Sequence, residues 1–304
     1  HQFPALGNIE VVQLGAGEDV GSVIAEYRAN GLVEVAEPDY KLKASATPND
    51  PELASGHQWG LHNTGWNNGT PDADIHAVQG WDTLHDASGV IVAVIDSGIR
   101  YTHQDLAGNM WTNPNEIPDN GIDDDHNGFI DDVHGVNAIV DGGNPNDDNG
   151  HGTHVAGIIG AVGNNGVGTV GVAWKVQLMA CKFLDSAGNG DTSDAIQCID
   201  YARRNGARVM NASWGGPDSS SALYTAISNA RSAGIIFVTA AGNDGMNLDS
   251  FSNYPAGYDL DNIITVCATT RDDLFDGSYS NYSPTKVDVA APGTLIYSTW
   301  QSSD

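Results

Sequence analysis

Two residues lie where the sequence pattern changes, and together they can do acid–base chemistry. The β-branched run of residues 90–95 ends in Asp96, and His151 opens a later run of small residues. Histidine exchanges protons near neutral pH because its unperturbed pKa is about 6.5. A carboxylate bonded to one ring nitrogen fixes the tautomer and stabilises the imidazolium, so that the other nitrogen can activate a hydroxyl nucleophile. Either residue alone would more often be structural, but together they predict that Asp96 orients His151 as a catalytic base.

A run of acidic residues at 119–132 has the spacing of a calcium-binding loop. From position 123, side-chain oxygens occupy the first, third and fifth places, and a glycine occupies the sixth, as in an EF-hand. His134 takes the twelfth place, where an EF-hand has a bidentate glutamate. The alternative is an acidic turn without a ligand. The expected calcium ligands are Asp123, Asp125, Asn127, Phe129 and, to close the loop, Asp131 or Asp132.

This chemistry needs a scaffold, and the pattern beyond residue 47 supplies one. Short apolar runs alternate with helical patterns, which predicts an α/β fold with a doubly wound, mostly parallel sheet and helices on both faces. Such sheets place their chemistry at the carboxyl ends of the strands. The predicted strands are residues 90–95, 177–183, 209–211, 235–240 and 263–268, and the predicted helices are residues 74–84, 152–162, 191–205 and 222–233.

Composition restricts the possible partners. With 12 basic and 39 acidic residues, the formal net charge is −27, which opposes binding to nucleic acid or to an anionic membrane and favours calcium. No run of 18 consecutive apolar residues occurs, so no membrane-spanning helix is expected. Cys181, Cys198 and Cys267 are an odd number in apolar or helical surroundings, which favours buried free thiols. A bridge between Cys181 and Cys198 stays open, because sequence does not give their separation.

Five segments resemble motifs of the subtilase family of serine endopeptidases. The carboxylate precedes the histidine, which is the order in subtilisin. The resemblance runs from about Ile9 to the last residue. It implies a subtilisin-like fold and hydrolysis of peptide bonds by an Asp, His and Ser triad, with Asp96 and His151 as the first two members. The segments are residues 90–98, 149–157, 211–216, 240–245 and 289–293.

The same resemblance implies a substrate site. Asn243, which alone would be a turn residue, matches the asparagine that donates a hydrogen bond to the oxyanion. A substrate is expected to bind in extended form between two edges, which read mainly its backbone. Small walls admit large apolar side chains, and Asp244 at the pocket mouth favours lysine or arginine unless it is only a solvated turn residue. The expected substrate-binding residues are Ser213, Trp214, Gly215, Asn189, Gly190, Ala240, Ala241, Gly242 and Asp244.

Similarity to thermitase implies a second calcium site. Its side-chain ligands match two carboxylates and one amide, and three backbone oxygens complete it. Read alone, the amide belongs to an Asn-Asn-Gly turn, so the assignment depends on the family motif. The implied residues are Asp50, Asp105 and Asn165 by side chain, and Val162, Val167 and Thr169 by backbone.

Residues 1–46 resemble the second half of a subtilase propeptide, a partial α+β inhibitor and chaperone, and residues 47–304 resemble the peptidase domain. A strand at 9–14, a helix at 18–30 and a strand at 33–44 are expected, with residues 41–46 directed toward the substrate groove. An ordinary N-terminal subdomain is the alternative. The resemblance implies a secreted, monomeric zymogen whose partners are protein or peptide substrates and its own propeptide.

One family motif is missing from the 304 residues. Gly-Thr-Ser-Met-Ala, which carries the catalytic serine, occurs nowhere between Ala291 and Asp304. We therefore expect the chain as it stands to hydrolyse no peptide, and to be an incomplete piece of a calcium-stabilised endopeptidase. The alternative is a catalytically dead protein whose groove binds peptides or its own prosegment. Retention of Asp96, His151 and Asn243 favours the first reading, because no structural need requires all three.

Overall fold

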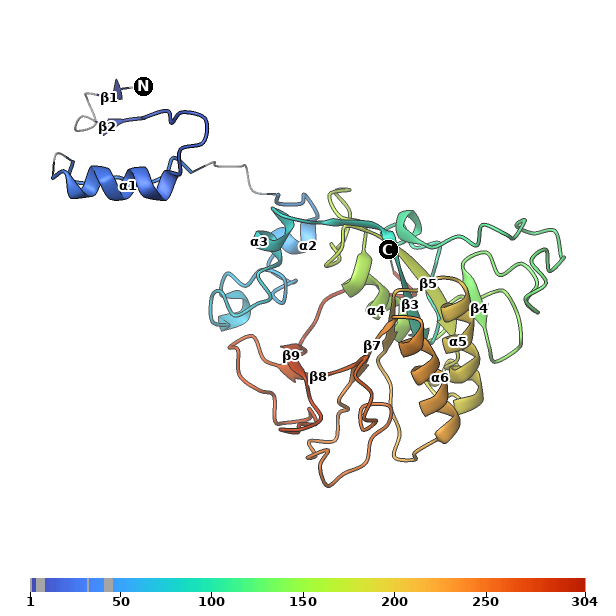
Figure 1. The fold of residues 1–304 in the computed structure, drawn as a ribbon. Coiled ribbons are helices and arrows are strands. Elements are labelled where there is room, and N and C mark those ends of the chain that lie inside the picture. The colour runs from blue at the N-terminus through green and yellow to red at the C-terminus, as the bar shows by residue number, and fades with distance from the viewer. Residues whose placement is uncertain (1, 4–8, 32, 41–45, 304) are drawn as a thin grey trace. The chain divides into compact units, whose positions relative to one another are not determined.

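The structure, a computed structural model, describes residues 2–3, 9–31, 33–40 and 46–303. The chain divides into two compact units, His1–Ala44 and Ser45–Asp304 (Figure 1). The predicted position of residues 41–45 at the substrate groove lies outside the described residues. Ala46 belongs to the second unit, where its backbone N–H donates to Asp82 Oδ1 over 2.6 Å.

The first unit contains a short antiparallel pair and one helix. Strands β1 (Gln2–Phe3) and β2 (Ile9–Glu10) pair, and helix α1 spans Val20–Ala29. Asp19 caps the helix, since its side chain accepts from the backbone N–H of Ser22 over 2.9 Å. The helix prediction is confirmed, but the predicted strand at 9–14 ends at Glu10. The predicted strand at 33–44 is wrong over residues 33–40, which have no strand; Pro38 lacks the N–H that a strand interior needs, and the Arg28 guanidinium binds Ala36 O instead.

The second unit is built on a seven-stranded sheet within its described residues. All neighbouring strands are parallel, in the order β4-β5-β3-β6-β7-β8-β9. The strands are β3 (Asp86–Asp96), β4 (Gly135–Asn137), β5 (Lys175–Lys182), β6 (Val209–Ala212), β7 (Ile236–Ala240), β8 (Ile263–Thr269) and β9 (Val289–Pro292). The helices are α2 (Pro51–Ala54), η2 (Trp66–Asn68), α3 (Ala77–Trp81), η3 (Ala107–Asn109), α4 (His151–Gly160), α5 (Thr192–Arg204) and α6 (Ser221–Ser232).

Helices cover both faces of this sheet, and the alternation along β3 shows which face each helix covers. Successive strand residues point to opposite faces. Ala93 and Ile95 pack in one buried cluster with residues of α5 and α6, which lie side by side in Figure 1. Val92 and Val94 pack in a second buried cluster with Ala156 of α4. Because β3 is apolar on both faces, the sequence pattern is a continuous run and not an alternation.

The predicted fold class is therefore confirmed: a doubly wound, mostly parallel α/β sheet. All five predicted strands are present, three of the four helices match closely, and the helix predicted at 74–84 is shorter, Ala77–Trp81. Strands β4 and β9 were not predicted, because runs of three and four residues carry no readable period. Asp96 and Lys182 are register partners at the carboxyl ends of β3 and β5, so this edge gathers the candidate catalytic residues.

Candidate functional site

Asp96 and His151 meet at the carboxyl edge of the sheet. Asp96 ends β3 and His151 is the first residue of α4, and their Oδ1 and Nδ1 atoms lie 2.7 Å apart. The Asp96 carboxylate is fully buried, and Oδ1 also accepts from the Ser97 backbone N–H over 2.7 Å. The His151 side chain is 50% exposed. The hydrogen bond that His151 donates to Asp96 raises the pKa of His151, and the charges of Asp96 and Asp147 add to this against the opposing effect of burial.

Two glycines allow β3 and α4 to approach closely. At Gly152, a Cβ would lie 2.1 Å from Gly98 O and 3.2 Å from Asp96 Cβ. Gly98 itself has φ of +102°, and a Cβ there would lie 2.3 Å from Pro145 O. Any larger side chain at either position would separate the carboxylate from the imidazole. The two glycines therefore bring the strand end and the helix start within hydrogen-bonding distance.

A buried carboxylate and a buried amine that sequence reasoning missed surround this pair. Asp147 accepts hydrogen bonds from Ser97, Asn149, Gly150 and Thr153. Lys182 Nζ donates to Ser97 O over 2.7 Å and to Leu184 O over 2.8 Å, and pairs with Asp148 over 2.7 Å. The available signal is a lysine that directly follows the apolar run of residues 178–181, since a buried lysine needs partners.

Asn243 lies in the exposed loop that follows β7. Two buried asparagines hold that loop: the side-chain amides of Asn253 and Asn281 donate to Ala241 O over 2.8 and 3.0 Å. Asn281 Oδ1 also accepts from the backbone N–H groups of Asp244 and Met246. No sequence signal distinguishes these two asparagines from ordinary turn residues.

Two predicted substrate segments border the site. Trp214, after β6, donates its indole N–H to Ile95 O over 2.8 Å, and its ring packs on Phe183 with centroids 4.9 Å apart. Asn189 closes a turn with Asp185, and a Cβ on Gly190 would lie 2.4 Å from Phe183 O. Segments 183–190 and 213–215 are therefore both packed beside the end of β3.

The predicted pocket residues stand in the β7 loop. Ala241 is buried, Ala240 and Gly242 are half-buried, and Asp244 is exposed. A Cβ on Gly215 would lie 2.6 Å from Asn253 Oδ1, and a Cβ on Gly242 would lie 2.6 Å from Asn253 Nδ2, so Asn253 lies between the two segments. Asp244 Oδ2 accepts from Asn281 Nδ2 over 3.2 Å. Ser213 accepts from Asn211 Nδ2 over 2.9 Å.

The six residues predicted for the second calcium site lie in one hydrogen-bonded network. The Asp50 carboxylate accepts from the backbone N–H groups of Asn164 and Asn165, and Asp105 accepts from the Asn165 amide over 2.8 Å. Val162 N–H donates to Asp105 O, Val167 N–H to Asn165 Oδ1, and Thr169 N–H to Asp105 Oδ2. Burial raises the pKa of both carboxyl groups, and the negative charge of Asp105 adds to the rise at Asp50.

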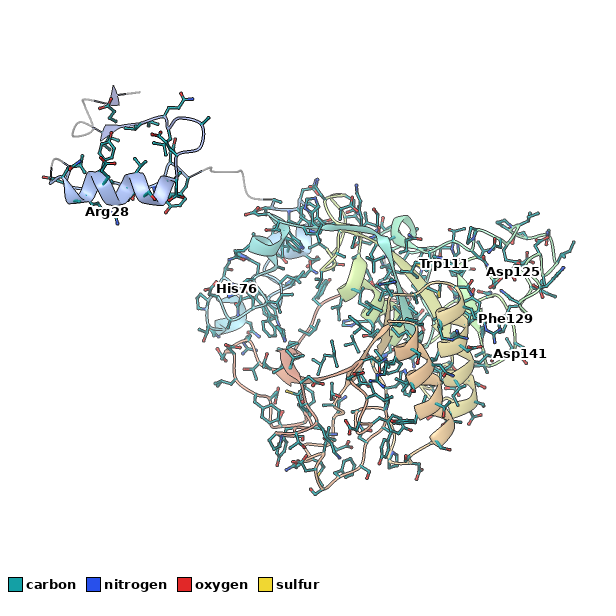
Figure 2. The ribbon with its side chains drawn as sticks, in the orientation of Figure 1. Arg28, His76, Trp111, Asp125, Phe129 and Asp141 are labelled. Carbon is teal, nitrogen blue, oxygen red and sulfur yellow. The ribbon has the colours of Figure 1, made fainter. Side chains whose placement is uncertain are left out.

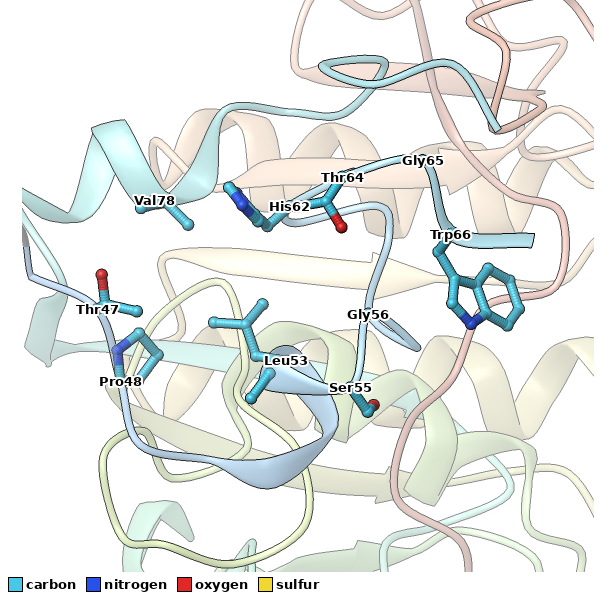
Figure 3. A pocket seen from close by; sticks show the side chains of 11 residues that line it. Thr47, Pro48, Leu53, Ser55, Gly56, His62, Thr64, Gly65, Trp66 and Val78 are labelled. Atoms are coloured by element: carbon cyan, nitrogen blue, oxygen red, sulfur yellow. The ribbon is translucent and has the colours of Figure 1, made fainter. Parts of the chain in front are cut away.

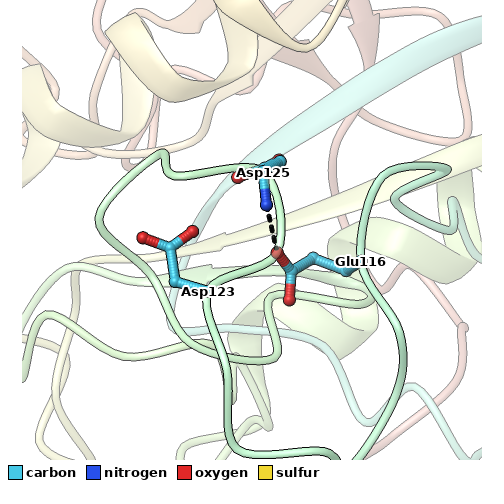
Figure 4. A group of neighbouring side chains, drawn as sticks. All are labelled: Glu116, Asp123 and Asp125. Carbon is cyan, nitrogen blue, oxygen red and sulfur yellow. Dashed lines mark hydrogen bonds between the residues drawn. The ribbon is translucent and has the colours of Figure 1, made fainter.

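The acidic loop gathers three carboxylates, one of which sequence reasoning missed. One oxygen each of Glu116, Asp123 and Asp125 lie within 4.8 Å of one another (Figure 4). Glu116 Oε1 accepts from the backbone N–H groups of Asp124 and Asp125 over 2.9 and 3.2 Å. Glu116 Oε2 is buried and has no hydrogen-bond partner among the described residues. Glu116 precedes the loop in sequence, outside the twelve-residue pattern, and so the pattern could not identify it.

The two residues predicted to close the loop differ in their roles. Asp131 accepts from the backbone N–H groups of Asn120 and Gly121, whereas Asp132 is fully buried and accepts from Asn127 Nδ2 over 2.9 Å and from the Tyr201 hydroxyl over 2.5 Å. Burial raises the pKa of Asp132 and of Glu116. Phe129 packs on the Tyr201 ring, and Figure 2 shows Trp111, Asp125 and Phe129 at this side of the molecule.

Other features of the described residues lie apart from this chemistry. A pocket of about 500 Å³ in the second unit is lined by Leu53, Trp66 and nine other residues (Figure 3), and includes none of the predicted site residues. Cys181, Cys198 and Cys267 are free thiols, as predicted, with the first two buried. No helix among the described residues is long and apolar enough to span a membrane.

Comparison with known proteins agrees with this arrangement. The sequence model of the subtilase family matches residues 87–304. The chain is 41% identical to subtilisin-like protease 1 of Plasmodium vivax over 80% of its length and 40% of the relative's. It is 36% identical to thermophilic serine proteinase of Bacillus sp. strain AK1, covering 92% of this chain and 60% of that protein, and 36% identical to thermitase of Thermoactinomyces vulgaris, covering 84% and 77%.

A solved structure is similar as well, and these findings together establish the family. A cold-adapted subtilisin-like serine proteinase has a TM-score of 0.60 and 30% identity, and the match covers 80% of this chain and 75% of that one. The chain spans about 40% and 60% of the length of the Plasmodium vivax and Bacillus relatives. The chain belongs to the subtilase family of subtilisin-like serine proteases.

Proposed function

We propose that the protein is a serine endopeptidase in which Asp96 orients His151 as the general base. The observation that carries this proposal is the 2.7 Å contact between Asp96 Oδ1 and His151 Nδ1 on a family motif. Because Nδ1 is bonded to the carboxylate, Nε2 is the nitrogen that can take a proton from a nucleophile and return it to the leaving amine. The half-exposed His151 imidazole is accessible to the nucleophile and to the leaving amine.

The nucleophile in this proposal is a serine in a Gly-Thr-Ser-Met-Ala segment. These 304 residues do not contain that segment. The 304 residues by themselves are therefore expected to hydrolyse no peptide, and an extended chain that includes the segment is expected to do so. Asn243 would donate its side-chain N–H to the oxyanion of the tetrahedral intermediate. Removal of one such donor typically reduces kcat by roughly 10²–10³-fold.

Substrate would bind as an added strand between segments 189–190 and 213–215. The support is the packing of Phe183 on Trp214, which places both segments beside Asp96. Ala240, Ala241 and Gly242 would line the pocket for the side chain before the cut, with Asp244 favouring a basic one. In the extended chain, Asp244→Asn would lower kcat/KM for a lysyl peptide more than for a phenylalanyl peptide. An equal loss of kcat/KM for both peptides would show that Asp244 does not determine specificity.

Calcium is the cation we propose for both carboxylate clusters. Hard oxygen ligands from carboxylates, amides and backbone carbonyls are those that calcium prefers. In the acidic loop, the buried Glu116 Oε2 without a hydrogen-bond partner fits a missing positive charge, and we propose Glu116 as the carboxylate that closes this site. In the other network, the ligands would be Asp50, Asp105, Asn165, Val162, Val167 and Thr169.

The first unit would be part of a propeptide, and the protein a secreted monomer. The support is its position before the peptidase unit and its small α+β composition, with a helix that has no buried residue. As a propeptide, the first unit would keep the linker that joins it to the second unit uncut until activation. Limited proteolysis of the extended chain would then release the first unit as activity appears.

One experiment tests the proposed function directly. Incubate the extended chain with an extended chromogenic peptide and with a serine-directed fluorophosphonate. Turnover that the fluorophosphonate abolishes, with covalent label on the predicted serine, is the expected result. Peptide binding without turnover or labelling would instead favour the catalytically dead peptide-binding protein.

A further inference from the structure

Asp147 lies next to the catalytic pair, and its carboxylate links the two segments that carry it. The side chain is only 3% exposed. Oδ1 accepts from Ser97 Oγ over 2.9 Å, Asn149 N–H over 2.9 Å and Gly150 N–H over 3.0 Å. Oδ2 accepts from Thr153 N–H over 3.0 Å and Thr153 Oγ1 over 2.6 Å. Five donors therefore converge on one buried carboxylate.

These contacts complete the cap of α4, in which Asn149 Oδ1 also accepts from the His151 N–H over 3.1 Å. The N-cap residue is Gly150, which has no side chain to bond the first free N–H groups of the helix. Asp147 accepts from Thr153 N–H, and Ser97 Oγ accepts from Gly152 N–H over 2.9 Å. Because His151 is the first residue of α4, the two acceptors fix the helix turn that carries the imidazole.

The same carboxylate also fixes the other half of the pair. Ser97 directly follows Asp96, and the Ser97 N–H donates to Asp96 Oδ1. Asp147 holds the Ser97 hydroxyl, while Lys182 Nζ holds the Ser97 carbonyl over 2.7 Å from the other side. These bonds fix Ser97, and with it the backbone N–H that holds the Asp96 carboxylate. A single buried group thus controls both the strand end and the helix start.

We propose that Asp147 is a positioning residue that sets the geometry of the Asp96–His151 pair. Asp147 touches neither reacting group, and acts through Ser97 and through the first turn of α4. The proposal rests on the proposed function for its catalytic meaning. The predicted effect of Asp147 on the contact between Asp96 and His151 does not depend on turnover, and can be measured on the 304-residue chain.

The charge of Asp147 provides a second, measurable effect. The charged groups that face His151 are Asp96 at the end of β3, Asp147 in the preceding loop and His154 on α4. The hydrogen bond with Asp96 raises the His151 pKa most, and the charge of Asp147 raises it further. Removing that charge and loosening the contact would both lower the midpoint of the His151 titration.

The test is a histidine titration by nitrogen-15 NMR on the 304-residue chain, with Asp147→Asn compared to Asp148→Asn. The control removes the same charge one residue away, and its partner Lys182 keeps two backbone carbonyls. For Asp147→Asn we expect the His151 midpoint to fall by roughly half a pH unit, and the Nδ1 proton bonded to Asp96 to broaden or vanish. The control should shift the midpoint far less. Equal shifts in the two variants would overturn the proposal.

A matched pair at Thr153 keeps the test decisive if Asp147→Asn fails to fold. Thr153→Ser retains the hydroxyl that donates to Asp147, and Thr153→Val removes it at similar volume. Thr153→Val should move the His151 midpoint in the same direction as Asp147→Asn, and Thr153→Ser should restore the wild-type value. Identical titrations for the two Thr153 variants would overturn the proposal.

Kinetics on the extended chain separate positioning from general stability. We expect Asp147→Asn to lower kcat by roughly 10- to 100-fold, because misplacement of about 1 Å has an effect of this size, with KM unchanged. A lower melting temperature with wild-type kcat would mean that Asp147 only stabilises the fold. Absence of turnover in the wild-type extended chain would contradict the proposed function, while the NMR comparison would still decide the role of Asp147.

Discussion

Two regions of the second unit contain buried carboxylates whose neighbours differ. At the catalytic edge, Asp96 is bonded to His151, a group that can become positive. In the acidic loop, the partners of Glu116, Asp123, Asp125 and Asp132 in the described structure are backbone N–H groups, the amides of Asn113 and Asn127, and the Tyr201 hydroxyl. None of these can carry a positive charge at neutral pH.

The difference indicates how each region balances a buried negative charge. Burial of an ionised carboxylate is unfavourable unless an opposite charge or good hydrogen bonds accompany it. At the catalytic edge, the partner of Asp96 is the titratable His151, which is the proposed base. The acidic loop has several carboxylates close together and only neutral donors to them among the described residues, which supports the proposal that a cation from solution binds there. Each prediction below tests this contrast.

The largest effect is expected at the catalytic edge. Asp96→Ala and His151→Ala in the extended chain should each reduce kcat by about 10⁴-fold or more, and the double variant should be no worse than the poorer single one, because the two groups act as a unit. His154→Gln is the matched control, since His154 Nε2 donates to Ile296 O, away from Asp96. Steady-state kinetics on these variants decide the matter. Substantial activity in either alanine variant would exclude the proposed base.

Removal of calcium should have the next largest effect. A ligand that binds only the folded state stabilises it by about 2.7 kcal/mol at 100 times its Kd, which corresponds to a fall in Tm of roughly 5–10 °C on chelation. Asp105→Asn and Asp123→Asn should each remove part of the calcium response, one for each site. Asp141→Asn is the charge control, because that exposed carboxylate lies outside both predicted sites and accepts a hydrogen bond from Gln197 Nε2. Differential scanning fluorimetry with and without chelator measures these shifts. An unchanged Tm would contradict both sites.

The two regions should also respond to pH, each in its own pH range. The pKa of His151 is raised, so its interaction with Asp96 stabilises the fold fully below the ordinary value of about 6.5 and is lost as pH rises through the raised pKa. Hydrolysis needs the neutral imidazole, so kcat/KM should rise over that same window. Stability curves and pH–rate profiles give both quantities. A profile that falls across this window would show that His151 is not the base.

The carboxyl groups of the two predicted calcium sites should respond in the same direction at lower pH. Burial raises the pKa of Asp50, Asp105, Glu116 and Asp132, so without a cation their contribution to stability is present below about 4 and is lost as pH rises through the raised values. Calcium binds the ionised forms. The gain in Tm from calcium should therefore be larger at pH 7.5 than at pH 5. A gain that is independent of pH would mean that calcium binds elsewhere.

The sequence predicted correctly those elements that depend on local residue spacing. The apolar run ending in Asp96 and the small-residue helix opened by His151 predicted both elements and the edge at which they meet. Residues that act through tertiary contacts carried no such signal. Glu116, Asp147, Asn253 and Asn281 look like ordinary loop residues, and only the fold shows them to be buried. The predicted strand at 33–44 failed over residues 33–40, because Pro38 lacks a backbone N–H and the Arg28 side chain takes the carbonyl of Ala36.

The smallest effect is expected at Asp131, where sequence spacing and structure give different closing residues for the acidic loop. The Asp131 carboxylate accepts from the backbone N–H groups of Asn120 and Gly121, and its left-handed φ of +53° suits asparagine. Asp131→Asn should therefore change the Kd for calcium by less than about threefold, roughly the 0.6 kcal/mol of one thermal energy unit. Glu116→Gln should weaken binding about tenfold or more, because it removes a ligand charge from the cluster of Figure 4. Calorimetric titration with calcium compares the two variants. A larger loss of calcium affinity for Asp131→Asn than for Glu116→Gln would show that the sequence spacing identifies the closing residue correctly. The role of Glu116 would then be to hold the Asp124 and Asp125 backbone N–H groups.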